Sequence, residues 1–227
     1  MLLLSIDSSA GASVALTRDD AVLAEWHTEA GNSHAEVLAP AVQRIMAEAD
    51  VSGAALDGVV VGVGPGPFTG LRVGLALAHS VATAWDKPLH GVCSLDSLAL
   101  RAVEAEIDGD FLAVTDARRR EVYWAHYTND DGDSGLVKGP FVDQAAACPD
   151  LPAVGAGVGL YAQTLTAASA ASSAWLPHAS ELALLAAGVL EGELTGVLCE
   201  PRPLYLRESD AKVPSQMGAG NRGAGNR

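Results

Sequence analysis

The sequence predicts an α/β fold built from two halves with the same order of elements. Leu2 to Ile6 is a short apolar strand that ends at Asp7, and Phe111 to Thr115 is another that ends at Asp116. Each is followed by two more strand patterns and then by helix, strand and helix. We therefore expect duplicated βββαβα halves with a cleft between them.

The predicted lobes are residues 1–106 and 107–211, and the last segment of the second lobe can pack back on the first. Ser215 to Arg227 contains Gly-Ala-Gly-Asn-Arg twice in succession and no apolar anchor beyond Met217. This composition is typical of a disordered tail, which we expect at 212–227.

A helix follows the first three strands, of which the second and third are predicted at 13–16 and 22–26. Ser33 followed by Glu36 forms a capping box, which predicts a helix to about Ala49. Because Pro40 removes an internal hydrogen bond, this helix either kinks or begins near Ala39. Its apolar surface is broad enough for two neighbours and consists of Val37, Leu38, Ala41, Val42 and Ile45.

The centre of the chain is a strand at 59–61, a glycine-rich loop at 62–70 and a helical run at 71–85. Strand, glycine-rich loop and helix is the order in which backbone N–H groups converge on an anion. The loop lacks the lysine and hydroxyl of a P-loop, and Pro65 and Pro67 each remove an N–H. A structural turn and an anion site therefore stay equal alternatives.

The helix after this loop is apolar nearly all round, so it must be covered on more than one side. Gly70, Gly74, Ala78 and Ala82 recur every four residues as a stripe that lets another helix approach closely. That helix belongs either to the same chain or to a second subunit. A bulky residue at Gly74 is expected to break a subunit interface and leave the monomer folded. The other interface candidates on this helix are Leu71, Val73, Leu77 and Val81.

The remaining elements are predicted by the same signals, with Ser94 as the cap of a helix. They are strands at 89–92, 121–127, 136–142 and 153–156, helices at 95–106 and 180–190, and a short helical piece at 143–147.

Composition excludes several classes of protein. The 227 residues include 14 Lys and Arg against 28 Asp and Glu, which gives a net charge of −14. A chain this acidic is a poor candidate for binding a nucleic-acid backbone without a partner. The three cysteines lie far apart without a CxxC, and no two of the six histidines are spaced as a helical metal pair. No signal peptide or apolar run of membrane length occurs, so we expect a cytoplasmic protein without a metal site.

Four ordered motifs resemble one family. They are Asp7-Ser8-Ser9 within the first hairpin, the loop and helix start at 64–74, the turn Asp116-Ala117-Arg118 before Glu121, and Pro203-Leu204-Tyr205-Leu206-Arg207. Together they are similar to the bacterial TsaB (YeaZ) family, a Gcp-like family related to TsaD, to about Ala211. The resemblance implies the two-lobed fold of the actin, Hsp70 and sugar-kinase superfamily.

The resemblance also implies a function. Members are non-catalytic subunits required to form N6-threonylcarbamoyladenosine at position 37 of tRNAs that read codons beginning with A. They bind and activate the catalytic homologue TsaD together with the ATPase TsaE, and the assembled complex uses ATP that this chain alone does not hold tightly. The implied contact surface is the two helices at 33–49 and 69–85, which also form a homodimer when the chain is alone. Contact with tRNA is implied only through the complex.

An ATP-hydrolysing member of this superfamily holds Mg-phosphate at two Asp positions, each followed closely by Gly. Asp7-Ser8-Ser9 and Asp116-Ala117-Arg118 lack that glycine, so these residues are weak candidates for nucleotide binding and no catalytic residue is predicted. The alternative is a small-molecule kinase or ATPase of the same superfamily.

The cluster Arg118, Arg119 and Arg120 has two interpretations, a solvated turn or a contact with tRNA or a partner carboxylate. Arg118 could also project into the cleft. The family usually has Gly near Arg120 and Ser at Pro67, so both a tight turn with positive φ and a phosphate-holding loop are in doubt.

Overall fold

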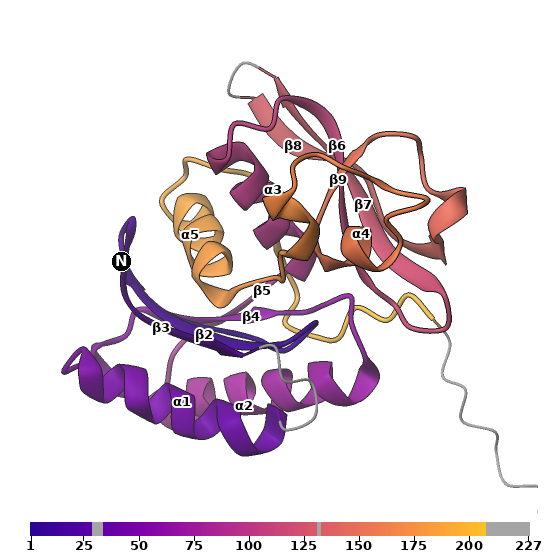
Figure 1. Cartoon of the computed structure of the whole chain (residues 1–227). Helices are drawn as coiled ribbons and strands as arrows, with labels where there is room; N and C mark the ends of the chain where they lie inside the picture. Colours follow the sequence, from indigo (N-terminus) through magenta and orange to yellow (C-terminus); the bar gives the residue numbers. More distant parts are fainter. Residues whose placement is uncertain (29–33, 131–132, 208–227) are drawn as a thin grey trace, which may run out of the picture.

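The computed structural model describes residues 1–28, 34–130 and 133–207. The predicted tail at 212–227 and Ser33 of the capping box lie outside these ranges. The fold consists of two β-sheets and two helical layers (Figure 1). The helices α1 and α2 cover one face of the first sheet, and α5 and α3 lie between the two sheets.

The first sheet has six strands in the order β11-β5-β4-β1-β2-β3. Strands β1, β2 and β3 form an antiparallel meander, and β4 and β5 run parallel to β1. Their bounds are β1 (Leu2–Asp7), β2 (Ala12–Arg18), β3 (Ala21–Thr28), β4 (Gly58–Gly62), β5 (Leu89–Val92) and β11 (Leu198–Cys199).

The second sheet has five strands in the order β10-β9-β6-β7-β8. Here β6, β7 and β8 form the antiparallel meander, and β9 and β10 run parallel to β6. The bounds are β6 (Gly109–Asp116), β7 (Glu121–Asp130), β8 (Asp133–Gln144), β9 (Pro152–Val154) and β10 (Thr166–Ala167). Apart from β11, strand order and direction repeat between the sheets, so the predicted duplicated α/β fold is confirmed.

The helices are unequal in the two halves. In the first half α1 and α2 connect the strands, whereas the second half has only the 3₁₀ turn η2 and a short α4 in the same places. Within the described ranges no helix is long and apolar enough to cross a membrane. The bounds are α1 (His34–Glu48), α2 (Phe68–Trp85), α3 (Ser94–Glu104), α4 (Ala156–Leu160), α5 (Ala179–Leu190), η1 (Gly53–Ala55), η2 (Ala145–Ala147) and η3 (Ala171–Ala174).

One alternative is excluded and one local prediction is wrong. The helix α1 continues through Pro40, which is exposed, so a start near Ala39 is excluded. Ser94 is the first residue of α3 and not its cap, because Cys93 occupies the N-cap position and the Ser94 hydroxyl is used elsewhere. The small elements α4, β10, η3 and β11 were not predicted, since they are too short to show a hydrophobic period.

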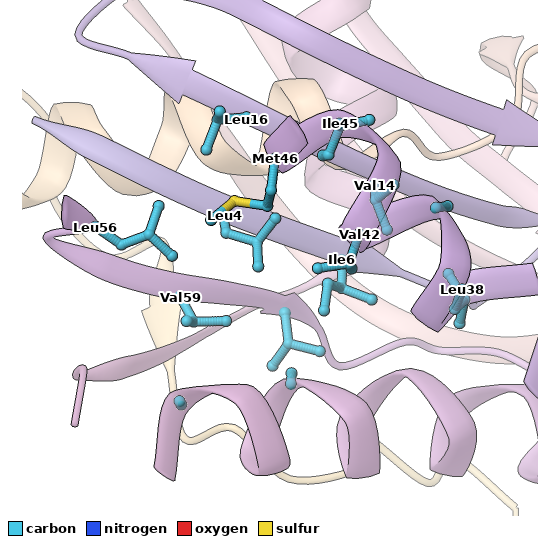
Figure 2. Close-up of a cluster of buried hydrophobic side chains, with 14 of the residues drawn as sticks. Leu4, Ile6, Val14, Leu16, Leu38, Val42, Ile45, Met46, Leu56 and Val59 are labelled. Carbon is cyan, nitrogen blue, oxygen red and sulfur yellow. The ribbon is translucent and has the colours of Figure 1, made fainter. Parts of the chain in front are cut away.

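Alternation along β1 explains how the first sheet is covered on both faces. Leu4 and Ile6 point toward Val42, Ile45 and Met46 of α1 (Figure 2), and all five side chains are buried. Successive side chains of a strand point to opposite faces of the sheet, so the neighbours of Leu4 and Ile6 along β1 point away from α1. Leu3 therefore packs with Leu182 and Ala186 of α5 on the opposite face.

The middle layer joins the two sheets. While α5 packs on the first sheet, Leu95 and Leu98 of α3 pack against Phe111 of β6 and Tyr127 of β7 in the second. The Tyr127 hydroxyl donates a hydrogen bond of 2.6 Å to the Asp96 carboxylate in the first turn of α3. Burial raises the pKa of Asp96 to about 6, although this hydrogen bond acts in the opposite direction.

We expect Asp96→Asn to make folding stability less dependent on pH between about 4 and 6. The pKa of Asp96 is higher in the folded protein than the ~3.9 of an unfolded chain, so the folded state keeps its proton longer. The contribution of Asp96 to stability is therefore present below pH ~4 and is lost as pH rises to about 6. Relative to wild type, the free energy of unfolding of the variant should rise by up to about 3 kcal/mol across this window and no further above it.

Urea unfolding at a series of pH values measures this difference. The control is Asp20→Asn in the exposed β2–β3 turn, which should stay within about 0.5 kcal/mol of wild type throughout. A difference between Asp96→Asn and wild type that does not change with pH would contradict the assignment.

Candidate functional site

The carboxylate of Asp7 lies at the end of β1 and is 1% exposed. Its Oδ1 accepts hydrogen bonds from the Ser9 backbone N–H at 2.9 Å and the Ser9 hydroxyl at 2.8 Å. Its Oδ2 accepts one from the Ser94 hydroxyl at 2.5 Å. Both oxygens are therefore engaged by donors of the same chain.

The glycine-rich loop before α2 is held by α3. The Gly64 N–H donates to the Ser94 hydroxyl at 3.1 Å, and the Ser94 N–H donates to the Gly64 carbonyl at 2.8 Å. The Val63 N–H donates to Val92, and Pro65 and Pro67 have no N–H. These groups serve the fold, so of the two alternatives the structural turn is favoured over the anion site.

Ser8 and Ser9 fill the space between this loop and α2. The Ser8 hydroxyl donates to the Gly70 carbonyl at 2.8 Å. A Cβ added to Gly74 would lie 2.2 Å from Ser8 Oγ, and one added to Gly66 would lie 2.4 Å from the Ser9 carbonyl oxygen. The glycines are thus required so that the β1–β2 turn can fit against the loop and helix.

These contacts correct the interpretation of the small-residue stripe. It faces the β1–β2 turn and the first sheet of its own chain, where Ala78 and Ala82 belong to the core. A bulky residue at Gly74 would have to displace Ser8, so the structure disfavours the expectation that such a variant leaves the monomer undisturbed.

The predicted interface residues divide by exposure. The four that are partly exposed are Val37 of α1 and Val73, Leu77 and Val81 of α2. The other nine are buried in the chain itself: Leu38, Ala41, Val42, Ile45, Gly70, Leu71, Gly74, Ala78 and Ala82. Whether the α1–α2 face binds a partner stays a prediction, but only its partly exposed residues and their exposed neighbours could touch one.

The second candidate carboxylate, Asp116, is part of the turn between β6 and β7. It accepts a hydrogen bond of 2.8 Å from the Arg118 N–H and pairs with Arg118 Nη1 at 3.3 Å. The Arg118 side chain is 75% exposed, so the structure favours a hairpin arginine over one projecting into the cleft. The φ angles of Arg118, Arg119 and Arg120 are 61°, 57° and 67°, and a tight turn with positive φ therefore forms without glycine.

A segment that we name the C-terminal strap, residues 200–207, runs from the first sheet to this turn. The Leu204 N–H donates to the Val63 carbonyl at 2.8 Å. The Tyr205 ring lies 4.5 Å from that of Phe68, and its hydroxyl accepts a hydrogen bond of 2.9 Å from Arg72 Nε. Finally Arg207 donates to the Ala117 carbonyl at 2.9 Å and forms an ion pair with Glu121.

The sequence predicts that the last segment can pack back on the first lobe, and Leu204 and Tyr205 do contact Val63, Phe68 and Arg72. The individual contacts of the strap were not predictable, because its partners lie up to 133 residues away in the chain. An arginine and a tyrosine in a segment without secondary structure were the available signals. As for metals, the part of the chain that the structure describes contains no group of three His, Cys, Asp or Glu side chains that could hold one.

Comparison with known proteins identifies the family. A family model described as "TsaD: tRNA N6-adenosine threonylcarbamoyltransferase" matches residues 27–188, more than half of the chain. The protein named tRNA threonylcarbamoyladenosine biosynthesis protein TsaB of Bacillus subtilis (strain 168) is 36% identical over 133 residues, which are 58% of this chain and 57% of the relative. The structure named YeaZ from Pseudomonas aeruginosa superimposes with a TM-score of 0.73 at 28% identity, covering 90% of this chain and 100% of that one.

This chain belongs to the TsaB (YeaZ) branch of that family. An uncharacterised protein of Mycobacterium tuberculosis (strain ATCC 25618 / H37Rv) is 40% identical over 206 residues, 88% of each chain. The resemblance inferred from the four sequence motifs is confirmed by the TsaB and YeaZ relatives and by the family model.

We expect Ser94→Ala to lower the free energy of unfolding by about 2–4 kcal/mol. The change leaves the Gly64 N–H and one Asp7 oxygen without their buried partner, and each loss is worth about 1–3 kcal/mol. Denaturant unfolding measures the effect. Ser80→Ala is the matched control, since its exposed hydroxyl bonds only to the preceding turn of α2. Equal stability of the two variants would contradict a structural role for the Ser94 hydroxyl.

Proposed function

We propose that this chain is a non-catalytic subunit in the formation of N6-threonylcarbamoyladenosine at position 37 of tRNAs that read codons beginning with A. It binds and activates the TsaD homologue of its own organism, together with a TsaE homologue, in the cytoplasm. Membership of the TsaB family supports the pathway, because the Bacillus subtilis relative is named for threonylcarbamoyladenosine biosynthesis. ATP is used by the assembled complex.

The observation that carries the non-catalytic role is the state of Asp7. In a nucleotide-using member of this superfamily the equivalent carboxylate faces Mg-phosphate. Here it is 1% exposed and accepts three hydrogen bonds from Ser9 and Ser94. The second carboxylate, Asp116, pairs with Arg118 in its own turn. This geometry disfavours the alternative of a small-molecule kinase or ATPase.

The α1–α2 face supports the partner-binding role. Val73, Leu77 and Val81 follow one another at intervals of four residues along α2, so they form one line of partly exposed apolar side chains. The exposed row beside this line begins with Arg72, which contacts Tyr205, and continues with the small residues Ala76, Ser80 and Ala84. A partner helix can therefore approach closely and bury apolar surface, which stabilises a complex by about 25 cal/mol per Å².

We expect Ala76→Glu to weaken binding of the TsaD homologue at least tenfold. Ala76 is exposed on α2, and glutamate is a good helix former, so the monomer should stay folded. In the complex the new carboxylate would be buried without a partner charge. Size exclusion with light scattering on the mixed proteins, followed by titration calorimetry, measures the change. If the homodimer uses the same face, the variant alone should also run as a monomer.

The control for this experiment is Ala146→Glu, at an exposed alanine of η2 in the other half of the molecule. It makes the same change in charge and should leave binding unaltered. Unchanged affinity of Ala76→Glu, or equal losses in both variants, would contradict the assignment of the α1–α2 face.

A further inference from the structure

Arg72 is the one Lys, Arg, Asp or Glu residue of the helix α2, and it is exposed. Ala76, Ser80 and Ala84 follow it at intervals of four residues, so the four side chains form one row along the helix. The rest of this row is small and uncharged. The α1–α2 face therefore has a single cation on α2, close to the start of the helix.

Two aromatic rings hold the guanidinium of Arg72 in place. Its Cζ lies 5.8 Å from the ring centre of Phe68, one turn earlier on α2, and 5.8 Å from that of Tyr205 in the C-terminal strap. Its Nε donates a hydrogen bond of 2.9 Å to the Tyr205 hydroxyl. Attraction to the rings and this hydrogen bond confine the guanidinium, although it is on the surface.

These contacts leave donors of both side chains unused. Within the residues that the structure describes, Arg72 forms no ion pair, and Nε is its one nitrogen with a hydrogen-bond partner. The Tyr205 hydroxyl accepts from Nε, so its own hydrogen can be donated to another acceptor. Tyr205 is 42% exposed. The Nη groups of Arg72 and the O–H of Tyr205 are thus available to one incoming acceptor.

The C-terminal strap and α1 border the exposed row of α2 on opposite sides. Arg72 contacts the strap through Tyr205, and His79 contacts it with Nε2 2.8 Å from the Pro201 carbonyl oxygen. On the other side of the row, the partly exposed apolar line of α2 packs in the same cluster as the buried residues of α1. Arg72 and Tyr205 are therefore continuous with the α1–α2 face.

We propose that Arg72 and Tyr205 together form a binding site for one carboxylate side chain of the protein that docks on the α1–α2 face. A carboxylate has two acceptor oxygens, which an arginine fork and a neighbouring hydroxyl can engage together. Because the rings already hold the guanidinium, little conformational freedom is lost on binding. Arginine and tyrosine are also enriched among the residues that carry most of the binding energy of interfaces. That the docking protein is the TsaD homologue rests on the proposed function.

A protein carboxylate fits this site better than a nucleic-acid phosphate. Arg72 is a single cation beside aromatic and small side chains, and the net charge of −14 repels a polyanion. One carboxylate on a protein surface is repelled much less. When the partner covers α2, this carboxylate and Arg72 leave water together, and each supplies the charge that the other needs.

Titration calorimetry of the full chain with the TsaD homologue, at a series of salt concentrations, tests this site. We expect Arg72→Gln to weaken binding at least tenfold at low salt, because the partner carboxylate is left buried without its cation. Since salt screens an ion pair, the ratio of wild-type to variant affinity should shrink as salt rises. Arg72→Lys keeps the charge but not the paired N–H donors, so it should recover part of the loss. Tyr205→Phe removes the hydroxyl and keeps the ring, and it should weaken binding by about three- to tenfold.

Two controls accompany these variants. Lys138→Gln removes an exposed cation that also lies over a ring, 5.4 Å from the centre of Phe141 in the second sheet, and it should leave binding unaltered. His79→Ala removes the other side-chain contact between α2 and the strap and should stay within about threefold of wild type. Equal losses in His79→Ala and Arg72→Gln at every salt concentration would overturn the proposal, since the position of the strap would then set the affinity.

The remaining outcomes separate this site from the proposed function. Binding that Ala76→Glu weakens and Arg72→Gln leaves unaltered would overturn the carboxylate site and keep the docking face. No binding of the TsaD homologue by the wild-type chain would overturn both. If Arg72→Gln bound the TsaD homologue normally but lost affinity for a fluorescent tRNA transcript, the carboxylate would be overturned in favour of a phosphate. Urea unfolding of Arg72→Gln should have the wild-type midpoint, because the side chain is exposed.

Discussion

The hydrogen bond from the Ser94 hydroxyl to the Asp7 carboxylate is the contact on which the centre of this molecule depends. It joins the end of β1 to the start of α3, and through the Gly64 N–H it also fixes the loop before α2. The N-terminus of α3 carries partial positive charge, which favours a carboxylate at this place. In this chain the Asp7 carboxylate is buried and its hydrogen bonds stabilise the fold. We therefore expect the surface of the protein, and not the buried Asp7 site, to carry its function.

The C-terminal strap has a related effect at the scale of the whole molecule. It contacts the loop before α2 through Leu204, α2 itself through Tyr205, and the β6–β7 turn through Arg207. Two elements that belong to different sheets are thus connected by one short segment. Together with the α3–α5 layer, the strap favours a fixed arrangement of the two sheets.

Strand and helix types were predictable because apolar alternation and helical spacing are local properties of the sequence. The duplicated order followed from two strands that end in Asp7 and Asp116. Which elements pack against each face of a helix or sheet could not be predicted. The stripe of Gly70, Gly74, Ala78 and Ala82 indicates that another element packs closely on this helix. Only the structure shows that this element is Ser8 together with the first sheet. Likewise Arg207 pairs with a turn about 90 residues earlier, a contact that no local pattern encodes.

The most direct test of this account is titration calorimetry of the isolated chain with Mg-ATP. Because Asp7 and the N–H groups of Val63 and Gly64 are already engaged by Ser9, Ser94 and Val92, we expect no saturable heat at millimolar nucleotide. Saturable, magnesium-dependent binding of ATP to the chain alone would contradict the account, since it would require these internal contacts to open and would restore the kinase or ATPase alternative.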